Sequence, residues 1–517
     1  MNDTKQAPER EAPMIDMRGV TKRFGDFTAI DAIDLTIYPQ EIHALLGENG
    51  AGKTTLMNTL YGLYEPTEGE IYIRGEKVHF SGPTDAIKAG IGMVHQHFML
   101  VENFTVLENI MLGRERTQAL DFLDKKKAEE EIRALSERYG LAIDLNATVN
   151  DISVGMQQRV EILKALYRGA DILILDEPTA VLTPQEITEI TGIIRELSQQ
   201  GRTIIIITHK LKEIKMLADR VTVIRRGKKV DTLPVEGTSE SEMANLMVGR
   251  QLTEVVNPRD DRVEDLGLRI EDLEVLDNRN IPKVKGLSLT LNKGEILGIA
   301  GIDGNGQSEL IEAVTGLRKA EGGHVYVGET EITNRSPQDV IEAGVGTIPE
   351  DRQRRGLVLD FTVEENMVLK DYKTDAFSDK GRIRHKAVHE HAENLSERFD
   401  VRPRNPELLA RALSGGNQQK VILAREISLD PDVLIAAQPT RGLDVGAIEY
   451  VHRFLLNQRA NGKAVLLLSF ELDEIMDLSD RIAVIYDGKI VAEMPAKEAD
   501  EKKLGLLMAG GAHDPAE

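Results

Sequence analysis

A glycine-rich loop near residue 50 carries the first chemical signal of this chain. It runs from Gly47 to Thr54 and matches the pattern GxxxxGK[ST]. An apolar run precedes it and a helix-forming run comes after it, which is the setting in which backbone N–H groups curl around phosphate oxygens. Lys53 is then expected to reach the β/γ-phosphates, and the Thr54 hydroxyl to bind Mg²⁺. The predicted phosphate-binding residues are Gly47, Glu48, Asn49, Gly50, Ala51, Gly52, Lys53, Thr54 and Thr55.

Two adjacent acids end a later apolar run, Leu173-Ile174-Leu175. Asp176 suits the coordination shell of Mg²⁺, and Glu177 suits the orientation and polarisation of an attacking water. His209 comes after another strand-like run and is expected to contact the γ-phosphate. Gln96 is expected to contact both Mg²⁺ and the water. Together these side chains predict hydrolysis of a nucleotide phosphate.

Phe24 lies in the short sequence Lys22-Arg23-Phe24-Gly25. We expect its ring to stack on an adenine base, an interaction worth about 1–3 kcal/mol per base. A role as an ordinary core aromatic is the alternative.

The chain contains the same motif series twice. Gly47 and Gly301 open the two glycine-rich loops and are 254 residues apart, whereas Ser153 and Ser414 are 261 apart. A net insertion of seven residues in the second copy accounts for the difference. The two halves are therefore a duplication.

Composition and spacing divide the chain into five parts. Residues 1–13 and 512–517 are expected to be tails, with the first disordered. Residues 14–250 and 266–511 form the two duplicated domains, and residues 251–265 form a linker that contains proline and several acids. Short apolar runs alternate with amphipathic helices in each half, which predicts an α/β fold with a mostly parallel sheet covered on both faces.

The second half lacks most of the predicted hydrolytic chemistry. Its glycine-rich loop has no lysine, and both acids are replaced. Gln307 stands where the first half has Lys53, Ala437 for Asp176, Gln438 for Glu177, Glu350 for Gln96, and Phe470 for His209.

A second motif shows the opposite pattern of erosion. The first half has Ser153-Val154-Gly155-Met156, whereas the second has Leu413-Ser414-Gly415-Gly416-Asn417-Gln418. Two adjacent glycines allow backbone to approach a phosphate closely, and β-branched Val154 prevents that approach. The second half also keeps an acid in Gly442-Leu443-Asp444. The residues expected to contact nucleotide here are Ser414, Gly415, Gly416, Asn417 and Gln418.

These motifs together resemble those of an ATP-binding cassette (ABC) ATPase, and the resemblance covers nearly the whole chain. It implies two nucleotide-binding domains, each with a RecA-like phosphate-loop core, an antiparallel β subdomain and a helical subdomain. It also implies ATP and Mg²⁺ as ligands. In this family two such domains pack head to tail, with ATP between the phosphate loop of one domain and the signature motif of the other.

Head-to-tail pairing within the chain explains why the defects are complementary. The phosphate loop of the first half and the signature of the second make one intact site, whereas the reverse combination joins two eroded parts. A second half that is retained only for packing is the alternative, but it leaves the preserved second signature unexplained.

Composition excludes several other classes of function. The formal net charge of −22 argues against a nucleic-acid-binding surface. The absence of cysteine excludes a disulfide framework and a thiolate metal site. No apolar run is long enough to cross a membrane. Composition therefore predicts a protein that is soluble or peripheral to a membrane. The resemblance implies a peripheral position on the cytoplasmic face of the cell membrane.

Tandem cassettes without a membrane segment occur in bacterial importers and in ribosome-associated translation factors. The short acidic linker favours an importer, which implies two permease subunits and an extracellular substrate-binding protein as partners. The segments Ser153–Glu161, Thr179–Pro184 and Ala436–Pro439 resemble the nucleoside-uptake branch. Monosaccharides such as ribose or galactose remain the alternative cargo, because an importer's ATPase does not touch the cargo.

One charged segment has no assigned role. The run from Pro349 to Gly356 mixes acids and arginines. It is expected to be either a solvated turn or a contact with a partner subunit.

Overall fold

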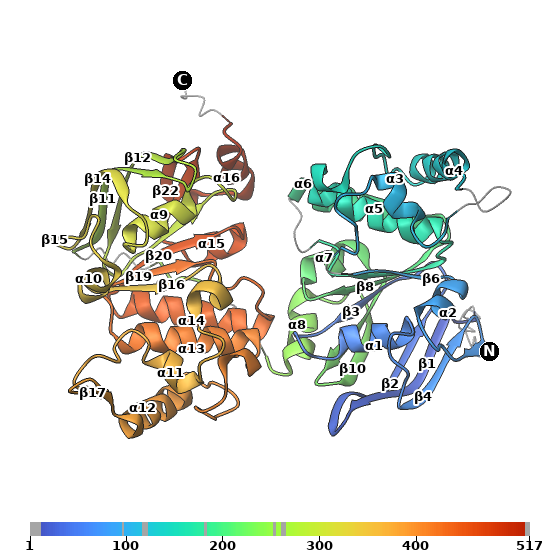
Figure 1. The fold of residues 1–517 in the computed structure, drawn as a ribbon, viewed down its shortest axis with the longest axis horizontal. Coiled ribbons are helices and arrows are strands. Elements are labelled where there is room, and N and C mark those ends of the chain that lie inside the picture. Colours follow the sequence, from blue (N-terminus) through green and yellow to red (C-terminus); the bar gives the residue numbers. More distant parts are fainter. Residues whose placement is uncertain are drawn as a thin grey trace, which may run out of the picture. The chain divides into compact units, whose positions relative to one another are not determined.

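The computed structural model describes residues 12–95, 98–115, 123–179, 184–251, 255–259 and 265–511. By their contacts these residues divide into two compact units, with the boundary between Leu252 and Thr253. Figure 1 shows that both units contain sheets and helices in a similar order along the chain. Within the described part of the chain, no helix is long and apolar enough to cross a membrane.

The first unit is built on a six-stranded sheet in the order β10-β9-β3-β8-β7-β6. All neighbours are parallel except β10 and β9. The central strands are continuous apolar runs that are buried on both faces, as parallel sheets require. The strands are β3 (Ile42–Leu46), β6 (Ile91–Val94), β7 (Ile172–Asp176), β8 (Thr203–Thr208), β9 (Arg220–Arg225) and β10 (Lys228–Pro234).

A separate antiparallel sheet, in the order β2-β1-β4-β5, completes the β structure of this unit. Its strands are β1 (Ile15–Phe24), β2 (Phe27–Ile37), β4 (Glu68–Ile73) and β5 (Glu76–Val78). Buried side chains of both sheets share one apolar cluster with helix α1 (Lys53–Leu60). This packing fixes the helix at the end of the first glycine-rich loop.

A helical part surrounds α5 (Val154–Tyr167), which contacts both α3 (Val106–Met111) and α4 (Lys125–Arg138). Helix α3 begins with a capping box, in which the Thr105 hydroxyl accepts from the Glu108 N–H (3.2 Å). The remaining helices of the unit are α2 (Pro83–Lys88), α6 (Pro184–Gln199), α7 (Leu211–Leu217) and α8 (Glu240–Val248).

The second unit repeats this architecture. Its six-stranded sheet has the order β16-β19-β20-β13-β21-β22 and is parallel except for the last pair. Its strands are β13 (Ile296–Ala300), β16 (Val345–Ile348), β19 (Val433–Ala437), β20 (Ala464–Ser469), β21 (Arg481–Tyr486) and β22 (Lys489–Pro495). The antiparallel sheet contains β11 (Leu266–Leu276), β12 (Pro282–Asn292), β14 (Ala320–Val327) and β15 (Thr330–Glu331).

The helices of the second unit also keep the order of the first. They are α9 (Gln307–Val314), α10 (Pro337–Glu342), α11 (Val363–Met367), α12 (His385–Arg398), α13 (Gly415–Ser428), α14 (Val445–Ala460), α15 (Leu472–Leu478) and α16 (Glu501–Met508). A small hairpin, β17 (Ser378–Asp379) with β18 (Arg382–Ile383), precedes α12. The predicted α/β class, with a mostly parallel core sheet, an antiparallel sheet and a helical part in each half, is confirmed.

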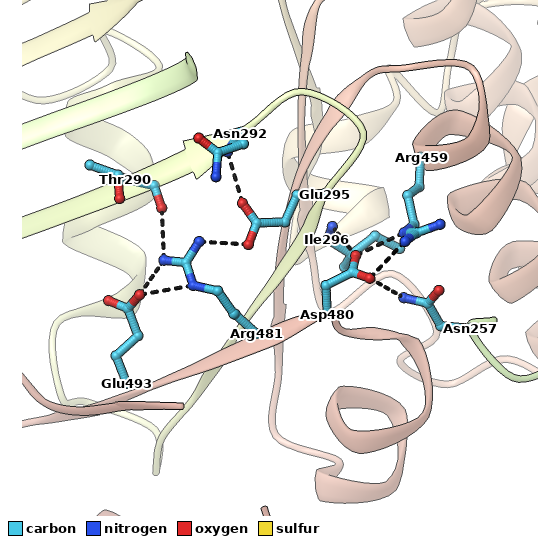
Figure 2. A network of polar contacts seen from close by, with 9 residues as sticks. All are labelled: Asn257, Thr290, Asn292, Glu295, Ile296, Arg459, Asp480, Arg481 and Glu493. Atoms are coloured by element: carbon cyan, nitrogen blue, oxygen red, sulfur yellow. Dashed lines mark hydrogen bonds and ion pairs between the residues drawn. The ribbon is translucent and has the colours of Figure 1, made fainter. Parts of the chain in front are cut away.

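Part of the predicted linker packs against the second unit (Figure 2). Asn257 is buried, and its Nδ2 donates to Asp480 Oδ1 (3.1 Å). Asp480 also accepts two hydrogen bonds from Arg459, both 2.8 Å, and one from the Ile296 N–H (2.8 Å). Because Ile296 begins β13, this network fixes Asn257 to the strand that leads into the second glycine-rich loop.

Candidate functional site

The predicted hydrolytic residues of the first half meet at one edge of its six-stranded sheet. Strands β3, β8 and β7 are parallel neighbours, with Leu46 opposite Thr208 and Ile207 opposite Asp176. The glycine-rich loop comes directly after β3, His209 after β8, and Glu177 after β7. Carboxyl ends of parallel strands share an edge, where open α/β sheets bind their ligands. Figure 1 labels β3 and β8 of this sheet in the first unit.

The glycine-rich loop is shaped so that only glycine fits at critical positions. Gly52 has φ 104°, and a Cβ there would lie 2.8 Å from both the Ala29 carbonyl oxygen and the Ile30 Cγ2. Lys53 is buried, and its Nζ donates to the carbonyls of Gly47 (2.6 Å) and Glu48 (3.0 Å). The lysine is thus held beneath the loop, from which its ammonium can move to a phosphate.

Asp176 is a buried acid in an environment suited to a cation. It is 7% exposed. Burial raises its pKa to about 6, and the charge of Glu177 adds to this shift, whereas Lys53 and a hydrogen bond with Thr54 lower the pKa. Burial and the neighbouring acid destabilise the charged form of Asp176. A bound divalent cation stabilises that charged form. The donor set of Thr54 and Asp176 therefore fits Mg²⁺.

Glu177 is held in a strained conformation and paired with His209. Its backbone has φ 48°, a region that non-glycine residues rarely adopt. The Glu177 N–H donates to the Ile207 carbonyl (2.9 Å), and its Oε1 lies 2.9 Å from His209 Nδ1. The hydrogen bond with His209 lowers the pKa of Glu177, opposing the effect of burial. The carboxylate is therefore ionised and oriented near neutral pH.

Phe24 is 44% exposed, so the alternative of an ordinary core aromatic is wrong. Its ring contacts Tyr64 edge-on, with centroids 5.2 Å apart, and Lys22 Nζ lies 5.3 Å from its centroid. Stacking on adenine stays a prediction. Gln96 lies outside the described residues.

Comparison with known families agrees with this geometry. The model of the ABC transporter family matches residues 30–180 and again residues 284–441. The chain belongs to the ABC transporter family. As an ABC ATPase it hydrolyses ATP with Mg²⁺ and acts together with membrane permease subunits.

Three relatives resemble the chain over almost its full length. The nucleoside import ATP-binding protein NupA of Lactococcus lactis is 54% identical over 96% of this chain and 98% of that protein. The guanosine import ATP-binding protein NupO of Bacillus subtilis is 55% identical, with 97% and 98% covered. The glucose import ATP-binding protein TsgD13 of Haloferax volcanii is 46% identical, with 96% of both chains covered.

The second half of this ABC ATPase keeps the backbone of the site without its chemistry. Gln438 has φ 46°, close to the 48° of Glu177, and its N–H donates to the Leu468 carbonyl (2.8 Å). Gln307 Nε2 donates to the Ile302 carbonyl (3.0 Å) in place of a lysine. Its amide carries no charge with which to bind phosphates.

Glu350 occupies the position that corresponds to Gln96, and it is engaged within its own unit. Its Oε2 accepts from the Ser308 hydroxyl (3.2 Å), and its Oε1 pairs with Arg441 Nη1 (3.1 Å). Ser308 corresponds to the predicted metal ligand Thr54. An internal ion pair therefore occupies the position that corresponds to the predicted metal site of the first half.

The preserved signature begins α13. Ser414 precedes this helix, and its hydroxyl accepts from Asn417 Nδ2 (2.9 Å). The Gln418 side chain is buried and donates to the Ala410 carbonyl (3.1 Å). Ser414 is exposed, Gly415 and Gly416 are half-buried at the start of the helix, and the Gln418 side chain is directed toward Ala410.

The eroded signature differs in its surroundings. The Ser153 hydroxyl caps α5 by accepting from the Met156 N–H (3.3 Å). The Glu186 carboxyl carbon would lie 2.8 Å from a Cβ added at Gly155. A carboxylate therefore lies against this signature, which is unfavourable for an approaching phosphate.

We expect that a catalytic glutamate restored to the second half will not restore turnover. In the double variant Glu177→Gln/Gln438→Glu, the second half still has Gln307 in place of the lysine and Ala437 in place of the metal acid. Steady-state phosphate release should match that of Glu177→Gln alone. Gln438→Glu by itself should turn over like the unmodified chain. Recovery of even a tenth of normal turnover in the double variant would contradict this prediction.

Proposed function

We propose that this chain is the ATP-hydrolysing subunit of an importer that takes up nucleosides. Residues 14–250 and 266–511 act as two nucleotide-binding domains on the cytoplasmic face of the membrane. They drive two permease subunits, and an extracellular binding protein delivers the cargo. The observation that carries the proposal is the segregation of chemistry: the hydrolytic side chains lie in the first unit, and the preserved signature lies in the second.

ATP binds at the edge of the first unit's sheet. The loop from Gly47 to Thr55 surrounds the phosphates with backbone N–H groups, and Lys53 supplies positive charge beneath the β/γ-phosphates. The exposed ring of Phe24 is positioned to stack on adenine. Thr54, Asp176 and Gln96 would hold Mg²⁺, which would neutralise charge on the phosphate oxygens.

Hydrolysis depends on Glu177. Its carboxylate accepts a proton from, and orients, the water that attacks the γ-phosphate. His209 fixes the carboxylate through the 2.9 Å contact and extends toward the γ-phosphate. The strained backbone at Glu177 fixes the direction in which the carboxylate projects.

The second unit completes this site in trans. In the proposed head-to-tail pairing, Ser414, Gly415 and Gly416 close on the γ-phosphate bound by the first unit. Closure around ATP and opening after hydrolysis move the two units, and this motion is passed to the permease subunits. The short linker keeps the second unit near the first, which raises its effective concentration. The other site would combine the phosphate loop of the second unit with the signature of the first. It lacks the lysine and the two acids that turnover requires.

The proposed cargo rests on the relatives rather than on the site. The two named for nucleoside and guanosine import are 54% and 55% identical to this chain. The relative named for glucose import is 46% identical, which keeps a monosaccharide as the second candidate. Nothing in the ATPase contacts the cargo, so only transport distinguishes the two.

Uptake by intact cells tests this proposal. A strain that lacks the gene for this chain should lose uptake of radiolabelled guanosine or uridine while it keeps uptake of ribose and glucose. The unmodified gene should restore uptake, and Glu177→Gln should not. Loss of sugar uptake alone would overturn the nucleoside assignment. Normal uptake of all four compounds would overturn the importer assignment, and co-sedimentation of the chain with ribosomes would then favour a translation factor.

A further inference from the structure

A turn in the second unit lies beside the preserved signature, and the sequence lengthens it relative to the first unit. Gln96 and Glu350 are 254 residues apart, whereas Thr105 and Thr362, which cap the next helices, are 257 apart. Three additional residues therefore lie between Glu350 and Thr362. They accompany a π-helical turn over residues 352–356. Such turns are frequent at functional sites.

The 352–356 turn packs directly on α13. Gln353 Nε2 donates to Gln418 Oε1 (3.3 Å), and a Cβ added at Gly356 would lie 2.5 Å from Ile422 Cδ1. The Leu357 N–H donates to the Arg352 carbonyl (2.8 Å), and this hydrogen bond closes the turn. This segment was expected to be either a solvated turn or a contact with a partner subunit. One side of the turn, with Gly356, packs on its own unit, whereas Gln353, Arg354 and Arg355 are exposed, so both interpretations stay predictions.

Arg352 connects the turn to two segments of the signature region. Its Nη1 donates to the Arg441 carbonyl (2.6 Å) and its Nη2 to the Gly442 carbonyl (3.4 Å). A Cβ added at Gly415 would lie 2.9 Å from Nη2, so the guanidinium also lies against the signature backbone. Arg441 in turn pairs with Glu350. One cation thus joins the signature to the segment that leads to Asp444.

The two signatures therefore have opposite charges beside them, at adjacent positions of the motif. Arg352 lies against Gly415, which corresponds to Val154, whereas Glu186 lies against Gly155, which corresponds to Gly416. The residue that corresponds to Glu186, at the same spacing of 261, is Ala447, which carries no charge. The first half's loop from Phe98 to Phe104 contains no lysine or arginine. A positive charge thus lies beside the preserved signature, and a negative charge from a different position lies beside the eroded one.

We propose that Arg352 is a positioning residue for ATP turnover. It holds Gly415 and the carbonyls of Arg441 and Gly442 in the arrangement that closes on the γ-phosphate, and it provides positive potential there. This inference rests on the proposed head-to-tail pairing. Because the planar fork of arginine bonds both carbonyls at once, lysine is only a partial substitute.

The test compares Arg352→Ala with Arg354→Ala in the full chain assembled with its permease subunits. Arg354 belongs to the same turn, but its side chain is 89% exposed. Arg352→Ala should lower kcat about 10-fold or more, within the range expected when a reacting geometry is misplaced. Binding of a fluorescent ATP analogue to the open chain should stay unchanged. Arg354→Ala should behave like the unmodified chain, and Arg352→Lys should recover part of the loss.

Hydrogen exchange gives a readout that does not depend on activity. Amide exchange over residues 414–418 and 441–444 should accelerate in Arg352→Ala and should be unchanged in Arg354→Ala. Equal kcat and equal exchange in the two variants would overturn the inference. Gly416→Asp, measured in parallel, separates the two proposals. If it abolishes turnover while Arg352→Ala does not, the pairing stands and the role of Arg352 fails. If neither variant reduces turnover, the pairing itself fails.

Discussion

Glu177→Gln is expected to lower steady-state ATP hydrolysis by about 1,000-fold, the scale on which a positioned general base contributes to catalysis. Glutamine has the shape of glutamate but cannot accept a proton from water. The residues that we propose to surround the phosphates, including Lys53, are unchanged. ATP binding should therefore persist, and the nucleotide should remain uncleaved. Phosphate release and the identity of the retained nucleotide measure the two effects.

The chain itself provides the structural control for this substitution. Gln438 occupies the matching position of the second half with φ 46°, against 48° at Glu177, so glutamine is compatible with this strained backbone. The unfolding temperature of Glu177→Gln should consequently be close to that of the unmodified chain. Turnover above about a tenth of normal, with ATP still bound, would assign the base to another residue.

The elements that carry the hydrolytic site could be predicted from sequence because their signals are local. A run such as Ile204–Ile207 must be a buried strand, and the residues at the carboxyl ends of parallel strands lie at one edge of a sheet. Lys53, Asp176, Glu177 and His209 lie together in the structure for that reason. Because the chain is a duplication, each element predicted in the first half has a counterpart predicted in the second half.

The environment of the signature could not be predicted in the same way. Arg352 lies 63 residues before Gly415 in the sequence, and no periodic pattern links a π-helical turn to a helix that far away. Glu186 is likewise an ordinary first-turn acid of α6, whose approach to Gly155 depends on how two helices pack. Asn257 belongs to a sequence typical of a linker, yet it is buried by contacts with Asp480. Each of these contacts depends on tertiary packing.

The signature that completes the live site is expected to be the one in the second half. Gly416→Asp places a carboxylate beside the γ-phosphate and should lower turnover at least ~100-fold, the scale of losing a contact to the transition state. Gly155→Asp makes the same change in the eroded signature and should lower turnover far less. A Cβ at Gly416 would lie 3.1 Å from Ala447 Cβ, so any side chain there disturbs the packing. Each aspartate variant therefore needs an uncharged control variant with a side chain of the same size.

Gly416→Asn and Gly155→Asn supply that control. If charge at the γ-phosphate is the cause, Gly416→Asn should retain clearly more turnover than Gly416→Asp, while the two should unfold at similar temperatures. At Gly155 the new carboxylate meets Glu186, whose flexible side chain can turn away, so any loss there should appear in the unfolding temperature rather than in kcat. ATPase activity of the four variants, assembled with their permease, measures the asymmetry. If Gly155→Asp proved the more damaging, the phosphate loop of the first half would have to pair with a different partner, and the complementary erosion of the two halves would need another cause.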